Sequence, residues 1–277
     1  MISRLIGSVV RGVLVALLIV VPTLMLPGSA QDTSQVVALV AMVAAGLTFM
    51  EYFATYPSIV EFRDAKPFNR LRFVTLAVTI LVLSVIGRDA SSPSVLTGGF
   101  RALGTIIGHA ADFPYSPVRL VLLALPSGLP PATVNAVRMA AGLAYVLSAL
   151  SLVIFFCLMR LRDWPHRSGV FNVWVNLPLF DPTAGGDVLY RLKRDANINA
   201  ALGFVLPFLI PAVIEVSSDV FDPISFTDPQ TLVWTITAWA FLPASMMMRG
   251  MALWRVAEMI EEKRRRAYRS TEQVRTA

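Results

Sequence analysis

The stretch MAAGLAYVLSALSLVIFFCLM, residues 139–159, carries no charged side chain and decides the fold class of this chain. A helix needs about 20 mostly apolar residues to cross the hydrocarbon core of a bilayer, and this run is long enough. The whole chain agrees, because 56% of its 277 residues are hydrophobic and only 15% are charged. Soluble domains carry about 25% charged residues, so the composition excludes an ordinary soluble enzyme. The same values exclude a disordered protein, which needs low hydrophobicity.

Five further apolar segments accompany this stretch and predict an all-α polytopic integral membrane protein with about six transmembrane helices. The predicted spans are 12–26, 33–50, 73–87, 139–159, 198–214 and 230–248. The first and third are short, although Arg11 and Arg72 can lengthen them by reaching the interface. The third span is the weaker prediction, since a short run can also be re-entrant. Residues 1–255 then form one transmembrane domain, and residues 256–277 form a basic cytoplasmic tail.

The distribution of positive charge orients this bundle. With the N-terminus in the cytoplasm and alternating spans, 20 of the 24 Lys and Arg residues fall on the cytoplasmic side. Cytoplasmic loops of membrane proteins are enriched in Lys and Arg, so we expect both termini in the cytoplasm. The net charge of +6 therefore needs no nucleic-acid partner. The chain has 21 Arg, three Lys and no N-glycosylation sequon, which favours a bacterial inner membrane.

The outer segment 92–131 predicts an amphipathic helix on the membrane interface. Leu96, Phe100, Leu103 and Ile107 follow one helical face at spacings of four, three and four residues. A seventh span in this segment is the alternative. It would place the later basic segments outside, against the orientation rule.

The N-terminal segment has a second interpretation. Its positive start, the apolar run 12–26 and the small residues 28–30 resemble a secretory signal peptide cleaved between Ala30 and Gln31. We favour a retained span, because Arg11 lies deep in the segment and Pro22 interrupts the apolar run.

The longest cytoplasmic loop, residues 160–197, is either an elbow between two spans or a docking surface for a partner. Residues 181–186 predict a turn, and Asp187 then caps a short helix that runs through Leu189 and Leu192. The candidate docking residues are Asp181, Asp187, Arg191 and Arg194.

The tail beyond residue 255 predicts a helix that continues the sixth span. Its basic cluster consists of Lys263, Arg264, Arg265 and Arg266. Such a cluster beside a span attracts anionic lipids at the cytoplasmic face, so these are candidate lipid contacts. Docking of a partner is the alternative, and nucleic-acid binding is not expected because no matching fold signature is present.

Ionisable residues at the ends of spans are functional candidates. Glu51, Arg11 and Arg249 all lie near the predicted cytoplasmic boundary, where Glu51 can pair with either arginine or serve as a gate. Pro207 and Pro211 interrupt the fifth span. Broken helices line binding sites in transporters, while a kink without function is the simpler interpretation.

Catalytic signatures are not found in the sequence, which predicts no cofactor, no metal site and no catalytic residue. His109 and His166 fall on opposite sides of the membrane, and Cys157 lies in an apolar span. A pair of His109 and Asp112 at the outer surface is the remaining enzymatic candidate. We therefore expect a non-enzymatic accessory, scaffold or assembly subunit of a membrane complex, with a membrane protein partner or a homo-oligomer. The alternative is a small secondary transporter or channel that uses the Pro-kinked fifth span and Glu51.

Overall fold

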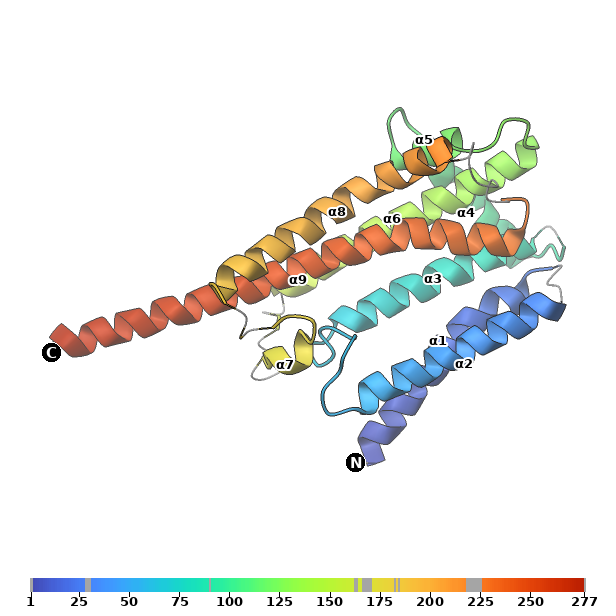
Figure 1. The fold of residues 1–277 in the computed structure, drawn as a ribbon. Helices are drawn as coiled ribbons and strands as arrows, with labels where there is room; N and C mark the ends of the chain where they lie inside the picture. The colour runs from blue at the N-terminus through green and yellow to red at the C-terminus, as the bar shows by residue number, and fades with distance from the viewer. Residues whose placement is uncertain are drawn as a thin grey trace.

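The computed structural model describes residues 2–27, 31–89, 91–161, 164–165, 171–181, 183, 185–217 and 226–276, and Figure 1 shows its fold. Every regular element in these ranges is a helix. Among the described residues, six helices are long and apolar enough to cross a membrane: α1 (Ile2–Met25), α2 (Gln31–Phe53), α3 (Phe68–Arg88), α6 (Pro131–Leu161), α8 (Val188–Ser217) and α9 (Pro229–Thr276). The shorter helices are α4 (Val95–Ala111), α5 (Pro117–Leu123) and α7 (Val173–Asn176). The prediction of an all-α chain with six such helices is confirmed.

The long helices extend past the apolar runs from which they were predicted. The third one, α3, is a single helix of 21 residues, which gives no support to a re-entrant segment. Asp187 caps α8 as expected, because its carboxylate accepts a hydrogen bond from the Leu189 N–H at 3.1 Å. The short helix expected after it is wrong in extent, since α8 runs without a break through the fifth span. The tail likewise continues α9, as predicted.

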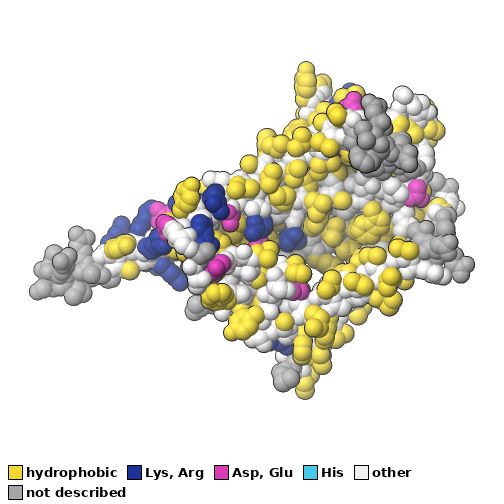
Figure 2. Space-filling model, in the orientation of Figure 1, with side chains coloured by type: hydrophobic (Ala, Val, Ile, Leu, Met, Phe, Trp, Pro, Cys, Tyr) yellow, Lys and Arg dark blue, Asp and Glu magenta, His cyan; other side chains and the backbone are white. Residues whose placement is uncertain are grey.

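Successive long helices alternate in direction, so that both termini lie at the same end of the molecule (Figure 1). We call this the basic end; it carries Arg63, Arg72 and Arg249, and Figure 2 shows Lys and Arg gathered there. Helices α3, α6 and α9 contact one another in the centre, and α8 lies along α9. The hairpin of α1 and α2 joins the other described helices through α1 alone.

Two hydrophobic clusters form the core. One lies between the long helices around Ile80, Val137 and Ile236. The other lies at the basic end, where Phe155 and Trp164 pack beside residues of the connecting segments. The second cluster fixes the loops and therefore shapes the surface of this end.

Close helix contacts depend on small residues. A Cβ added to Gly12 of α1 would lie 2.9 Å from the Ala45 carbonyl oxygen of α2. A Cβ on Gly203 of α8 would lie 2.6 Å from the Pro243 oxygen of α9. Small residues let membrane helices approach closely, so these contacts set the spacing within both helix pairs.

The predicted amphipathic helix is observed as α4, but its buried side differs from its apolar stripe. Leu96 and Leu103 of that stripe remain exposed, at 62% and 47%. Gly104 and Gly108 are buried instead, because a Cβ on Gly108 would lie 3.0 Å from Met139 Cα of α6. Ile107 of the stripe packs against the core, while the exposed Leu96 and Leu103 suit a helix at a membrane interface. Its position relative to the membrane stays a prediction.

Candidate functional site

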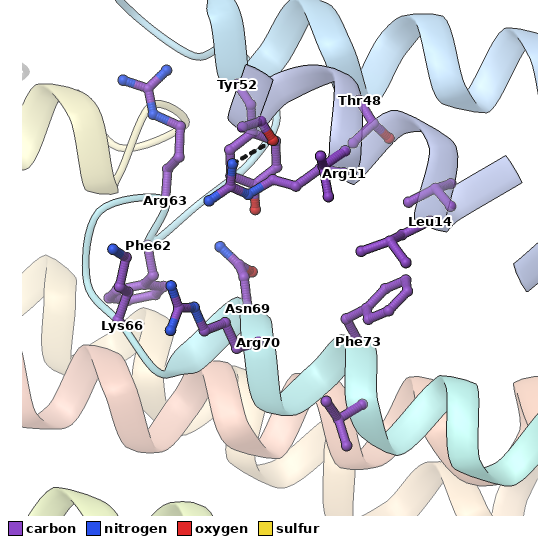
Figure 3. A pocket seen from close by; sticks show the side chains of 14 residues that line it. Arg11, Leu14, Thr48, Tyr52, Phe62, Arg63, Lys66, Asn69, Arg70 and Phe73 are labelled. Atoms are coloured by element: carbon purple, nitrogen blue, oxygen red, sulfur yellow. Dashed lines mark hydrogen bonds between the residues drawn. The ribbon is translucent and has the colours of Figure 1, made fainter. Parts of the chain in front are cut away.

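A cavity of about 490 Å³ opens at the basic end between α1, α2, α3 and the loop that joins α2 to α3 (Figure 3). Four basic side chains line it: Arg11, Arg63, Lys66 and Arg70. The described residues that line it include no Asp or Glu, and most of the remaining wall is apolar. We call this space the basic cavity.

Glu51 holds the loop that forms one wall of the basic cavity. Its carboxylate accepts hydrogen bonds from the backbone N–H groups of Ser58, Ile59 and Val60 at 3.0, 2.9 and 2.9 Å. The sequence predicted that Glu51 pairs with Arg11 or Arg249. The structure pairs Glu51 with the loop instead. Glu51 instead satisfies loop donors that would otherwise be left without partners.

Arg63 closes the C-terminal end of α2. Its side chain is only 6% exposed and donates to the carbonyl oxygens of Glu51, Ala54 and Thr55 at 3.0, 2.8 and 3.2 Å. The last carbonyls of a helix have no partner within it and carry partial negative charge. Arg63 therefore adds positive charge to the basic cavity while its N–H groups bond the carbonyls at the end of α2 and the start of the loop.

The other side of this loop is held by the segment around α7. Asn176 Oδ1 accepts from the Asp64 and Ala65 N–H groups at 3.1 and 3.2 Å. Phe62 adopts a positive φ of 52°, which a bulky residue rarely does. Its ring is buried 5.7 Å from that of Trp164, centroid to centroid, so the surrounding packing fixes this conformation.

Arg11 points into the basic cavity from α1. Its Nη1 donates to the Gly7 carbonyl at 2.6 Å, the dashed line in Figure 3, and its guanidinium lies 4.5 Å from the centre of the Tyr52 ring. A Cβ on Gly7 would lie 2.9 Å from this Nη1, so glycine leaves room for the arginine to fold back. Hydrogen bonding and the cation–π contact hold the charge at the cavity wall.

Arg249 pairs with Glu61, a residue that the sequence did not single out. The two carboxylate oxygens of Glu61 lie 2.7 and 2.5 Å from Nη2 and Nε of Arg249. Buried Arg72 Nε nearby has no hydrogen-bond partner. Residues 63–72 contain four Lys and Arg. That density of cations, with the acidic residues Glu61 and Asp64 beside it, was the available signal for Glu61, Lys66 and Arg70.

The two prolines of α8 lie in a continuous helix. Pro211 lacks the N–H that would bond the carbonyl of Pro207, four residues earlier. The indole Nε1 of Trp239 donates to that carbonyl at 3.1 Å. Pro211 also lines an apolar cavity of about 350 Å³ together with Trp239. The freed carbonyl is thus satisfied within the protein.

The candidate docking residues fix the start of α8. Asp187 accepts hydrogen bonds from both terminal nitrogens of Arg264 at 3.1 and 3.0 Å. The Leu189 N–H and then Arg264 lower the pKa of the Asp187 carboxyl. Asp181 bonds Thr183 within the turn and also accepts from Arg191 through its carbonyl. Arg194 lies 3.4 Å from Asp195, its neighbour in sequence.

The basic cluster of the tail lies on α9 beyond the bundle (Figure 1). Fifteen residues separate Arg264 from Arg249, which corresponds to about 22 Å along a helix. Arg265 pairs with Glu261 at 2.7 Å and Arg266 lies 3.8 Å from Glu262. Lipid contact by Lys263, Arg264, Arg265 and Arg266 stays a prediction.

At the opposite end, carboxylates pair with arginines. The Asp112 carboxylate lies 3.1 Å from Arg119 Nε and 2.9 Å from Arg138 Nε. The carboxylate of the His109 and Asp112 pair, which was the enzymatic candidate, therefore forms ion pairs with two arginines. Asp89 accepts from Thr97 Oγ1 at 2.6 Å and from Arg101 at 3.1 Å. These hydrogen bonds, Thr97 first, lower the pKa of the Asp89 carboxyl.

Two sequence predictions lie outside the described residues. They are the cleavage site after residue 30 and the position of His166.

No known family model matches this chain, and neither a curated protein nor a solved structure shows significant similarity to it.

Proposed function

We propose that this chain is a non-enzymatic accessory or scaffold subunit of a larger membrane complex, and that the end of α9 docks the partner. The observation that carries the proposal is the length of this helix. Its 48 residues correspond to about 72 Å, more than twice the roughly 30 Å of a hydrocarbon core. Residues 263–276, which we call the α9 arm, continue past the bundle (Figure 1).

The exposure of the α9 arm supports a docking role. Side chains 263–269 are all exposed. An isolated helix shorter than about 12–15 residues is marginal in water, so a helical arm gains stability from a surface that covers it. This stretch carries five Lys and Arg and no Asp or Glu, which fits an acidic protein surface. Two copies of one basic arm would repel each other, so we favour a different chain as the partner.

The proposed setting is the inner membrane of a bacterium, with both termini in the cytoplasm. Support comes from the positive-inside distribution and from the position of both termini at the basic end. The alternative of a transporter that uses the fifth span and Glu51 draws less support. Trp239 already bonds the carbonyl that Pro211 frees, and Glu51 bonds the α2–α3 loop.

The test is native mass spectrometry of the tagged chain extracted from its source membrane in mild detergent. We expect a complex of fixed stoichiometry with a second, acidic chain. A truncation after Glu262 keeps the buried residues Val256 and Met259, so the bundle should fold, and the complex should be lost at unchanged membrane levels.

A second variant separates charge from length. Replacing Lys263, Arg265 and Arg266 with Gln keeps the helix and the ion pair between Arg264 and Asp187. We expect this variant to weaken the complex too. A full-length chain that is monomeric or purely homo-oligomeric, or a truncated chain that retains the partner, would overturn the proposal.

A further inference from the structure

The basic cavity is polar at one side and apolar at the other. Lys66 and Arg70 lie close together in Figure 3, and Arg11 reaches in from across the space. Leu14 and Phe73 lie away from these cations, along α1 and α3. A ligand that fits both parts has an anionic head and an apolar chain.

Arg63 lies 3.5 Å from the Asp64 carboxylate. No carboxylate among the described residues that line the cavity neutralises Arg11, Lys66 or Arg70. The lining includes no Asp or Glu, and the nearby Glu51 carboxylate is bonded to the loop. Charges of the same sign held close together repel, and a bound anion removes that repulsion. Arginine and lysine both donate to phosphate oxygens, arginine in a bidentate manner.

The apolar side opens onto the surface that a bilayer would cover. Three of its wall residues are about half exposed: Val10 at 50%, Leu14 at 43% and Val74 at 53%. Such a wall admits a chain that enters sideways between α1 and α3. A soluble anion would leave this apolar wall unused, so the geometry favours a ligand that comes from the bilayer.

We propose that the basic cavity binds one anionic phospholipid of the surrounding bilayer. The phosphate lies between Arg11 and the pair Lys66 and Arg70, and an acyl chain runs along Leu14 and Phe73. Basic pockets between transmembrane helices on the cytoplasmic side bind anionic head groups in this way. A cavity of about 490 Å³ is within the usual size range of ligand pockets.

The site has a structural consequence, because the hairpin of α1 and α2 joins the other described helices through α1 alone. A lipid between α1 and α3 adds contacts across this junction. Bound lipid therefore stabilises the attachment of the hairpin, as any ligand that binds only the folded state does.

The experiment titrates the purified full chain in detergent with phosphatidylglycerol or with phosphatidylcholine of the same acyl chains, and native mass spectrometry counts bound lipids. We expect one tightly bound phosphatidylglycerol per chain and much weaker binding of phosphatidylcholine. The variant with Arg11, Lys66 and Arg70 all replaced by Gln should bind phosphatidylglycerol about 100-fold more weakly, given the usual contribution of each cation.

The matched control removes three charges that lie outside the basic cavity, with Arg88, Arg119 and Arg160 replaced by Gln. This control should bind phosphatidylglycerol as the unmodified chain does. An equal loss in the control would overturn the proposal, since it would show diffuse attraction by net charge. The variant Leu14→Trp fills the apolar side and keeps every cation, so it should also lose the lipid.

Competition distinguishes a lipid from a free anion. Excess inorganic phosphate should leave phosphatidylglycerol bound, because it does not occupy the apolar side. Displacement of the lipid by phosphate, or unchanged binding in Leu14→Trp, would show that the cavity does not hold an acyl chain and would overturn the proposal.

Discussion

The ion pair between Glu61 and Arg249 links the α2–α3 loop to α9. Replacing Glu61 should lower the stability of the fold by a different amount than replacing Arg249. The Glu61 side chain is 8% exposed and that of Arg249 is 28% exposed. Removing one partner of a buried ion pair lowers the free energy of unfolding by about 3–5 kcal/mol. Because Arg249 is partly exposed, we expect a loss of about 2–3 kcal/mol for Glu61→Gln. Arg72 then adds to the cost, because two guanidiniums remain with no anion between them.

Arg249→Gln should cost less than Glu61→Gln, because Glu61 keeps Arg72 as a nearby cation. The double variant should be more stable than the sum of the single effects predicts, by at least about 1 kcal/mol, since neither charge is then left alone. The assay is unfolding of the purified chain in mixed micelles of mild detergent and dodecyl sulfate, followed by circular dichroism. Additive single effects, or a larger loss for Arg249→Gln, would refute this reasoning.

Two further predictions concern the other end of the bundle and the fifth span. Trp239→Phe should lower the free energy of unfolding by about 1 kcal/mol, because the carbonyl freed by Pro211 loses its donor. In a Pro211→Ala background, where the backbone supplies that donor, the loss should shrink; equal losses in the same unfolding assay would contradict the assignment. Because the pKa of Asp89 is lowered on folding, its charged form stabilises the fold above its unfolded pKa of about 3.9, and this contribution disappears as pH falls through the folded pKa. Asp89→Asn should therefore lower the melting temperature at pH 7 and differ less from the unmodified chain near pH 3; a constant difference would mean that the charge is irrelevant.

The sequence correctly predicted the six long helices, because a run of about 20 apolar residues is a local property. It also predicted the N-cap at Asp187, where residue type and the following apolar pattern lie within one turn. It was wrong about the extent of that helix. The helix α8 continues without a break from Val188 into the fifth span, and its contacts with α9 stabilise it.

The candidate site was predicted only in part. Arg11 was found because it borders a span, but its expected partner Glu51 binds the loop instead. Lys66 and Arg70 were counted only as charges that orient the bundle. Their second role depends on the gap between α1 and α3, which no local pattern encodes.

By itself, the sequence determined the class of the protein, the number of long apolar helices and the placement of both termini at one end, since each follows from length, hydrophobicity and an even number of spans. The tertiary structure alone decided which charges meet. Glu61 and Arg249 lie 188 residues apart, and the Asn176 side chain reaches Asp64 across 112 residues. Such pairings depend on how loops fold onto a packed helix end, and the basic cavity exists because that packing leaves α1 and α3 apart.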